Sequence, residues 1–183
     1  MFFGEHISKL DAKGRVSIPA PHRAALDAEV EGARELVVYP SMRVSGVLEG
    51  VSRATLNDWA ARIRDGFQTG SQQQLAMSAA IMGRSIELKR DDTGRVVMRK
   101  DMITSLGLAK EVSFMGMGDR MFIGHPDLVR RFVDDCVGFA QQEQLVVPDP
   151  VRPNRSVTPG QPNYESPFAS RAAGSGIAGE EGM

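Results

Sequence analysis

The chain contains one cysteine, Cys136, among 183 residues. A single thiol cannot form an intramolecular disulfide, and it cannot supply the several thiolates of a cysteine-based zinc site within one chain. Such a composition is typical of proteins in reducing compartments, so we expect a cytoplasmic protein.

Long apolar runs are also missing. About 18 consecutive apolar residues are needed to span a membrane, and no such run occurs. Residues 1–6 lack the basic and apolar regions that begin a signal peptide. We therefore expect a protein that is neither exported nor membrane-spanning. Its 42% hydrophobic and 25% charged residues match an ordinary globular protein with a real core.

Arrangements that support catalysis are absent from the sequence. The histidines, His6, His22 and His125, fall in unrelated segments. No Ser/His/Asp set, glycine-rich phosphate loop or metal-ligand spacing occurs. Asp91 and Asp92 form a carboxylate pair, but adjacent side chains on a turn diverge. We predict no enzymatic activity, no cofactor and no metal.

The sequence does contain one pattern written twice. Asp-x-x-Gly-Arg occurs at residues 11–15 and again at 91–95, with starts 80 residues apart. A lysine precedes each copy, Lys9 in one case and Lys89 in the other, and a short apolar stretch follows each. Self-similarity over such a span indicates a repeated supersecondary unit. We therefore expect two similar halves.

The residue types of this pattern suit a tight turn that presents an arginine. Glycine tolerates positive φ, which a two-strand reversal requires. The arginine offers a planar fork of donors for a phosphate or a guanine edge, and the aspartate four residues earlier can hold it. These residues are Asp11, Gly14 and Arg15 in the first copy and Asp91, Gly94 and Arg95 in the second. The other reading is an ion pair that only braces a hairpin; duplication favours a function.

Charge is distributed unevenly along the chain. The net charge is −1, unlike that of strongly basic nucleic-acid-binding domains. However, residues 84–100 hold six basic and three acidic side chains, and residues 1–25 hold four basic and two acidic ones. Both positive stretches coincide with the repeat. If they share a face, that face can attract phosphates.

Alternation of apolar and polar residues predicts a mainly β protein with helices, in the α+β class. Two ββαβ units are expected, and their eight short strands could close into one β-barrel without exposed edges. Helical spacing predicts further helices near 53–67, 71–82 and 126–144, with a capping box at Thr55 and Asp58. We read the apolar stripes of these helices as core or subunit contacts. The expected strands are 6–10, 16–18, 35–39, 46–50, 85–89, 96–98, 111–114 and 121–123, and the expected short helices are 20–26 and 100–106.

Residues 1–143 resemble the MraZ family of bacterial transcription factors, in the AbrB/MazE superfamily. The resemblance rests on residues 1–5 with 10–19, on the second copy at 91–95, and on the run 110–123. It implies that the two halves form a swapped-hairpin, or double-split, β-barrel. The implied organisation is a first AbrB-like SpoVT half (1–50), a helical connection (51–83), a second half (84–124), a C-terminal helix (125–145) and a disordered tail rich in proline, glycine and serine (146–183).

The same resemblance implies a function. Family members assemble as ring-shaped homo-oligomers and bind direct repeats in double-stranded DNA upstream of their own gene. They regulate the division and cell-wall gene cluster, with repression as the default, in the cytoplasm at the nucleoid. No membrane or small-molecule substrate is implied. The residues carried over as DNA-binding are Lys9, Asp11, Lys13, Gly14 and Arg15, with Lys89, Arg90, Asp91, Gly94 and Arg95 as the equivalent set.

We expect Arg15 to contact guanine or phosphate, Asp11 to orient it, and the lysines to add phosphate contacts. The first copy matches the family more fully. Several subunits meeting successive repeats would multiply weak binding. An alternative is an antitoxin-type regulator of the same superfamily, whose tail neutralises a protein partner. Such antitoxins usually carry one hairpin unit per chain, whereas this sequence has two.

Overall fold

A computed structural model describes residues 1–29 and 34–148. Met1–Leu145 form one compact unit. From residue 149 onward the tail predicted at 146–183 lies outside the described residues. Both copies of the repeat belong to the compact unit, and the boundaries proposed within that unit stay predictions.

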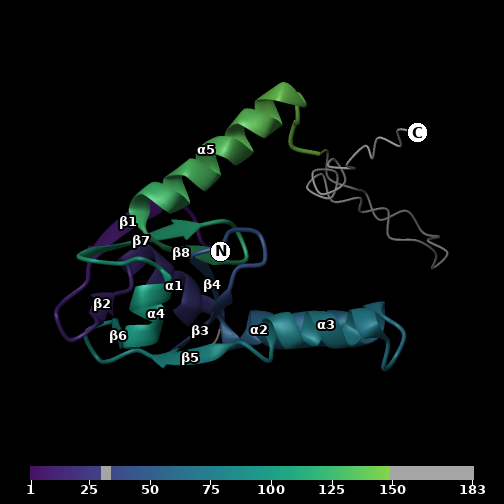
Figure 1. Cartoon of the computed structure of the whole chain (residues 1–183), viewed down its shortest axis with the longest axis horizontal. Helices are drawn as coiled ribbons and strands as arrows, with labels where there is room; N and C mark the ends of the chain where they lie inside the picture. Colours follow the sequence, from purple (N-terminus) through teal and green to yellow (C-terminus); the bar gives the residue numbers. More distant parts are fainter. Residues whose placement is uncertain (30–33, 149–183) are drawn as a thin grey trace, which may run out of the picture. The chain divides into compact units, whose positions relative to one another are not determined.

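The described residues form a mixed α+β fold, as predicted (Figure 1). The ββαββ order of the first half recurs in the second, and the expected elements are present with ends that differ from the prediction by no more than three residues. The elements are β1 (Glu5–Lys9), β2 (Arg15–Ser17), α1 (Ala20–Glu29), β3 (Glu35–Pro40), β4 (Val47–Val51), α2 (Arg53–Gly66), α3 (Gln72–Ile81), β5 (Ile86–Lys89), β6 (Arg95–Val97), α4 (Lys100–Ser105), β7 (Glu111–Gly116), β8 (Met121–Gly124) and α5 (Pro126–Gln142).

The two halves exchange their first strands. Six strands form an antiparallel sheet in the order β1-β7-β8-β4-β3-β5, and β2 and β6 form a separate two-stranded ribbon. Strand β1 of the first half pairs with β7 of the second, with Ile7 opposite Ser113. Strand β5 of the second half pairs with β3 of the first, with Leu88 opposite Leu36. Neither half therefore completes its own sheet.

The ribbon connects the two edges of the sheet. The first turn joins edge strand β1 to β2, and the second turn joins the opposite edge strand β5 to β6. Near the first turn Leu10 forms a single bridge with Val16. Among the described residues the strands thus form an open sheet and a ribbon, and the single closed barrel stays a prediction.

One large apolar core lies between the sheet, the ribbon, α1 and α4. It draws on equivalent positions of both halves, such as Val16 with Val96 and Leu26 with Leu106. A second cluster around Tyr39 and Trp59 packs α2 and α3 against the sheet. A third, which includes Phe122, Val129 and partly buried Phe132, attaches the first turns of α5. The helices outside the main core are thus fixed to the sheet by separate apolar contacts.

Helix α2 begins one turn earlier than the predicted capping box. The cap is Ser52, whose hydroxyl accepts a hydrogen bond from the Thr55 N–H at 3.0 Å. Ser52 keeps an extended backbone conformation, and the helix follows directly at Arg53. The prediction of Thr55 as the cap was therefore wrong. Its hydroxyl instead donates to Glu29 of α1 at 3.0 Å.

Candidate nucleic-acid interface

Each Asp-x-x-Gly-Arg copy forms the same tight turn. In the first copy the Gly14 N–H donates to the Asp11 carbonyl at 2.9 Å, and the Asp11 N–H donates to the Arg15 carbonyl at 3.0 Å. The second copy repeats both bonds, at 2.9 and 2.8 Å. The backbone φ is +76° at Gly14 and +82° at Gly94, a region that residues with a Cβ rarely adopt. Both turns therefore have the positive φ for which the sequence predicted a glycine.

An aspartate holds the arginine of each turn. Asp11 Oδ1 accepts the backbone N–H groups of Lys13 at 2.9 Å and Arg15 at 2.8 Å. Its Oδ2 accepts Nε–H of Arg15 at 2.7 Å. The backbone hydrogen bond from Arg15, followed by the bond from its side chain, lowers the pKa of Asp11 below its ordinary value. The carboxylate therefore stays charged at neutral pH and fixes the direction of the guanidinium.

The second turn repeats this clamp and adds one bond. Asp91 Oδ1 accepts the N–H groups of Thr93 and Arg95, each at 2.9 Å, and Oδ2 accepts Arg95 Nε–H at 3.1 Å. The Thr93 hydroxyl also donates to Oδ1 at 2.7 Å. This hydroxyl bond, with the backbone bond from Arg95, lowers the pKa of Asp91 strongly. The residue of the first turn that corresponds to Thr93 is Lys13, so the two turns differ in charge at this position.

The ribbon places both arginines on one surface. In its antiparallel register Arg15 lies opposite Val97, Val16 opposite Val96, and Ser17 opposite Arg95. The middle pair is buried in the core, so the two outer pairs face away from it. Diagonal neighbours such as Arg15 and Arg95 lie about 7–8 Å apart in such a ladder. The side chains of the two arginines are 40% and 41% exposed.

Each turn is also tied to the strand of the other half. The Met98 N–H donates to the Gly14 carbonyl at 2.8 Å, and the Ile18 N–H donates to the Gly94 carbonyl at 3.0 Å. These bonds extend the ribbon to the turn glycines. Only Nε of each arginine is used by its aspartate, and within the described part of the chain the terminal nitrogens make no hydrogen bond. Four N–H donors on each guanidinium therefore remain without a partner among the described residues, on side chains that are 40% and 41% exposed.

The two turns rest on different kinds of support. Ile103 of α4 lies behind Gly14, whereas the equivalent residue of α1, Arg23, lies behind Gly94. Arg23 also donates to the Ile18 carbonyl at 2.5 Å. The first turn is thus supported by an apolar side chain and the second by a charged one.

The other residues predicted at the site have two different environments. Lys9, Lys13 and Lys89 are exposed beside the turns. The Arg90 side chain is only 13% exposed and pairs with Asp27 of α1 at 2.5 Å. Arg90 corresponds in the repeat to Leu10, a residue that packs against the core. The structure thus brings three of these cations to the surface near the arginines and places the fourth in an ion pair behind the second turn.

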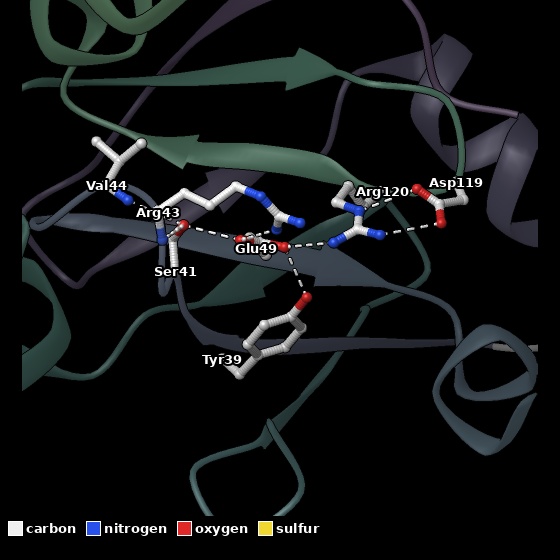
Figure 2. Close-up of polar contacts among 7 residues, drawn as sticks. All are labelled: Tyr39, Ser41, Arg43, Val44, Glu49, Asp119 and Arg120. Carbon is white, nitrogen blue, oxygen red and sulfur yellow. Dashed lines mark hydrogen bonds and ion pairs between the residues drawn. The ribbon is translucent and has the colours of Figure 1, made fainter. Parts of the chain in front are cut away.

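A buried ionic cluster lies outside the repeat and was missed by sequence reasoning (Figure 2). Glu49 of β4 is 1% exposed. Its carboxylate accepts hydrogen bonds from Tyr39 Oη at 2.7 Å, Ser41 Oγ at 2.8 Å and Arg120 Nη1 at 2.9 Å. Burial opposes ionisation, but these bonds outweigh it and lower the pKa of Glu49. A glutamate inside the apolar strand Val47–Val51 was the available signal.

The cluster joins the sheet to α2. The Arg120 guanidinium lies over the Trp59 ring, 4.3 Å from its centroid, and Asp119 accepts two further hydrogen bonds from it. Since every oxygen of Glu49 is occupied, the cluster has the geometry of a structural connection. In the described residues no three His, Cys, Asp or Glu side chains are grouped to hold a metal ion. No helix in residues 1–29 or 34–148 is long and apolar enough to cross a membrane.

Known proteins match the chain over most of its length. Residues 1–74 match a family model described as "MraZ protein, putative antitoxin-like". A "Transcriptional regulator MraZ" from Gluconobacter oxydans is 32% identical over 127 residues, 69% of this chain and 77% of the relative. The protein of that name from Hyphomonas neptunium is 35% identical over 69% of this chain and 74% of its own length. The one from Parvibaculum lavamentivorans is 31% identical over 72% of this chain and 80% of its own length.

These relatives confirm the resemblance inferred from the repeated motif. They also confirm that the chain is not an enzyme, since the name they share describes regulation of transcription. The chain belongs to the MraZ family of transcriptional regulators.

Proposed function

We propose that the protein binds double-stranded DNA through the outer face of the β2–β6 ribbon and its two turns. The observation that carries this proposal is the pair of arginines on one exposed ribbon face, each held by an aspartate through Nε and each with terminal nitrogens that have no partner among the described residues. A regulator of transcription needs such a surface, and a two-stranded ribbon fits the major groove.

Each predicted residue has a role in this proposal. Arg15 and Arg95 contact guanine edges or phosphates, and Asp11 and Asp91 set their direction. Gly14 and Gly94 allow the turns, while Lys9, Lys13 and Lys89 add phosphate contacts. Arg90 acts indirectly, because its ion pair with Asp27 supports the second turn.

We also propose that the ribbon closes the sheet into the swapped-hairpin, double-split barrel. The exchange of β1 and β5 between halves supports this closure, as does the connection of both sheet edges to one ribbon. In a closed barrel the two turns cannot move independently of the sheet edges. This rigidity suits a surface that must hold two arginines in register.

One ribbon covers few base pairs, so we propose that several copies act together. A ring-shaped homo-oligomer would meet direct repeats about 10–10.5 base pairs apart on one face of the DNA. Binding of one subunit raises the effective concentration of the next. By family resemblance, we propose that the site lies upstream of the protein's own gene in the division and cell-wall cluster, and that binding represses it at the nucleoid.

Fluorescence anisotropy tests the proposal directly. The full chain is titrated into labelled DNA from upstream of its own gene and into a scrambled duplex, across a salt series. We expect preference for the native fragment and an affinity that falls as salt rises. Equal binding to both duplexes, or none to either, would refute the proposal.

Two variants separate the proposed contacts from general charge. Arg15→Ala should weaken specific binding about tenfold or more, because a good base contact discriminates by that order. Arg64→Ala is the matched control, because Arg64 is an exposed arginine paired with the adjacent Asp65 on α2. Equal effects of the two substitutions would show that Arg15 contributes only charge.

The antitoxin-type alternative loses support from the topology. This chain supplies both exchanged hairpins, whereas antitoxins of that class usually carry one hairpin unit and dimerise. A chain ending at residue 148 distinguishes the two functions. If the protein acts by binding DNA, the shortened chain should keep specific binding. If it is an antitoxin, the shortened chain should lose its protein partner.

A further inference from the structure

One large apolar side chain lies on the outer face of the ribbon next to both arginines. Val97 is 58% exposed, directly opposite Arg15, and two residues along the same strand from Arg95. Positions two apart on a strand share a face. The inner face already holds the buried pair Val16 and Val96. The apolar core therefore does not account for a valine at position 97.

The equivalent residue of the first half is Ser17. The two arginines occupy equivalent positions, because Arg15 begins β2 and Arg95 begins β6 in the antiparallel ribbon. The residues opposite them differ. Arg15 faces Val97, whereas Arg95 faces Ser17. One end of the outer face thus presents an arginine with two methyl groups, and the other presents an arginine with a hydroxyl.

We propose that Val97 is a specificity-determining residue that contacts the C5-methyl group of a thymine, next to the base contacted by Arg15. This inference rests on the proposed function. The thymine methyl is the apolar feature of the major groove, and if both arginines enter that groove, the exposed valine next to them is placed to meet it. A ribbon with identical halves would make the same base contacts in either orientation on the DNA. Because Val97 and Ser17 differ, the two orientations of the ribbon should bind the same base pairs with different affinity.

The test replaces each thymine of the specific duplex, one at a time, by deoxyuridine, which lacks only that methyl group. Anisotropy with the full chain should show one thymine position per bound unit at which the replacement weakens binding about fourfold, the effect of one buried methyl group. Val97→Ser should bind the unmodified duplex about fourfold more weakly and lose the sensitivity to uracil at that position.

Ser17→Val is the matched control, because it changes the equivalent position and should keep the sensitivity to uracil. Thermal melting of each variant checks the fold. If Val97→Ser melts early, Val97→Thr keeps the branched shape and should show reduced sensitivity. Wild-type protein with no uracil-sensitive position, or Val97→Ser with undiminished sensitivity, would overturn the inference. Failure of the proposed function is visible separately, as absent preference for the unmodified duplex over the scrambled one.

Discussion

At the scale of single residues, each aspartate of the repeat organises a turn and directs an arginine. Asp11 accepts two backbone N–H groups on one oxygen and the arginine Nε on the other. The carboxylate therefore shapes the loop and orients a cation with the same side chain. An amide at this position would keep one acceptor oxygen but lose the charge and the second acceptor.

Asp11→Asn should reduce specificity more than total affinity. Without the carboxylate Arg15 samples more directions, while loss of a negative charge favours contact with any phosphate. We expect the ratio of specific to scrambled binding to fall by up to about fivefold, the scale of an exposed ion pair. Anisotropy on both duplexes measures this ratio. An unchanged ratio would show that Asp11 does not orient Arg15 on DNA.

The turn glycines should differ in their tolerance of alanine. Both have positive φ, which costs a residue with a Cβ roughly 1–2 kcal/mol. At Gly14 the new Cβ would lie 2.6 Å from the Met98 carbonyl oxygen, which is backbone of the ribbon. At Gly94 it would meet the Arg23 side chain, 2.5 Å from Cδ, which can move. We expect Gly14→Ala to destabilise more, by about 1 kcal/mol beyond Gly94→Ala, in chemical denaturation. The reverse order would contradict this account of the two turns.

At the scale of elements, the buried Glu49 cluster connects β3, β4 and the turn before β8 (Figure 2). Arg120 extends it to α2 through its contact with the Trp59 ring. Helices α2 and α3 lie next to each other and project from the sheet (Figure 1). Their attachment therefore depends on the Tyr39–Trp59 apolar cluster and on this ionic one. If the charge of Glu49 is removed, partly buried Arg120 keeps only one acidic partner, Asp119.

Glu49→Gln should destabilise the protein by about 2 kcal/mol or more at pH 7, because a buried charge loses its partner. The folded pKa of Glu49 is lowered, so its contribution is complete above its ordinary value of 4.5 and is lost as pH falls through the lower folded value. Denaturation at pH 7, 4 and 3 should show the wild type and variant converging at acid pH. Asp58→Asn, at an exposed pair on α2, is the control and should have little effect. A constant difference across this pH range would contradict the assignment.

At the scale of the whole molecule, the exchange of strands makes the two halves one folding unit. Strand β1 depends on β7, β5 depends on β3, and one core contains side chains from both copies. A half that is produced alone has an unpaired strand and an exposed apolar surface. Such a half can pair this strand and bury this surface only by associating with a second copy of itself.

Chains of residues 1–83 and 84–145 should therefore be unfolded as monomers. Circular dichroism with gel filtration should show either loss of structure or a concentration-dependent dimer, and an equimolar mixture should recover native-like spectra. A folded monomeric half would contradict the importance of the exchanged pairing.

Much of this organisation could be predicted from local patterns. Gly14 and Gly94 marked the turns, alternation around them marked the strands, and helical spacing marked α2, α3 and α5. The cap at Ser52 was missed because Thr55 and Asp58 offered a similar pattern one turn later. Arg90 was grouped with the surface cations because its burial against Asp27 depends on a contact between residues 63 positions apart.

Residue types that lie within a few positions of one another were enough to predict the repeat, the order of the elements, the two turns and the family. The folded structure was needed to show which strands pair, that both arginines share one face with Val97 next to them, and that Glu49 is buried in contact with cations. These features depend on the register between distant strands, where a shift of one residue would turn each side chain to the opposite face.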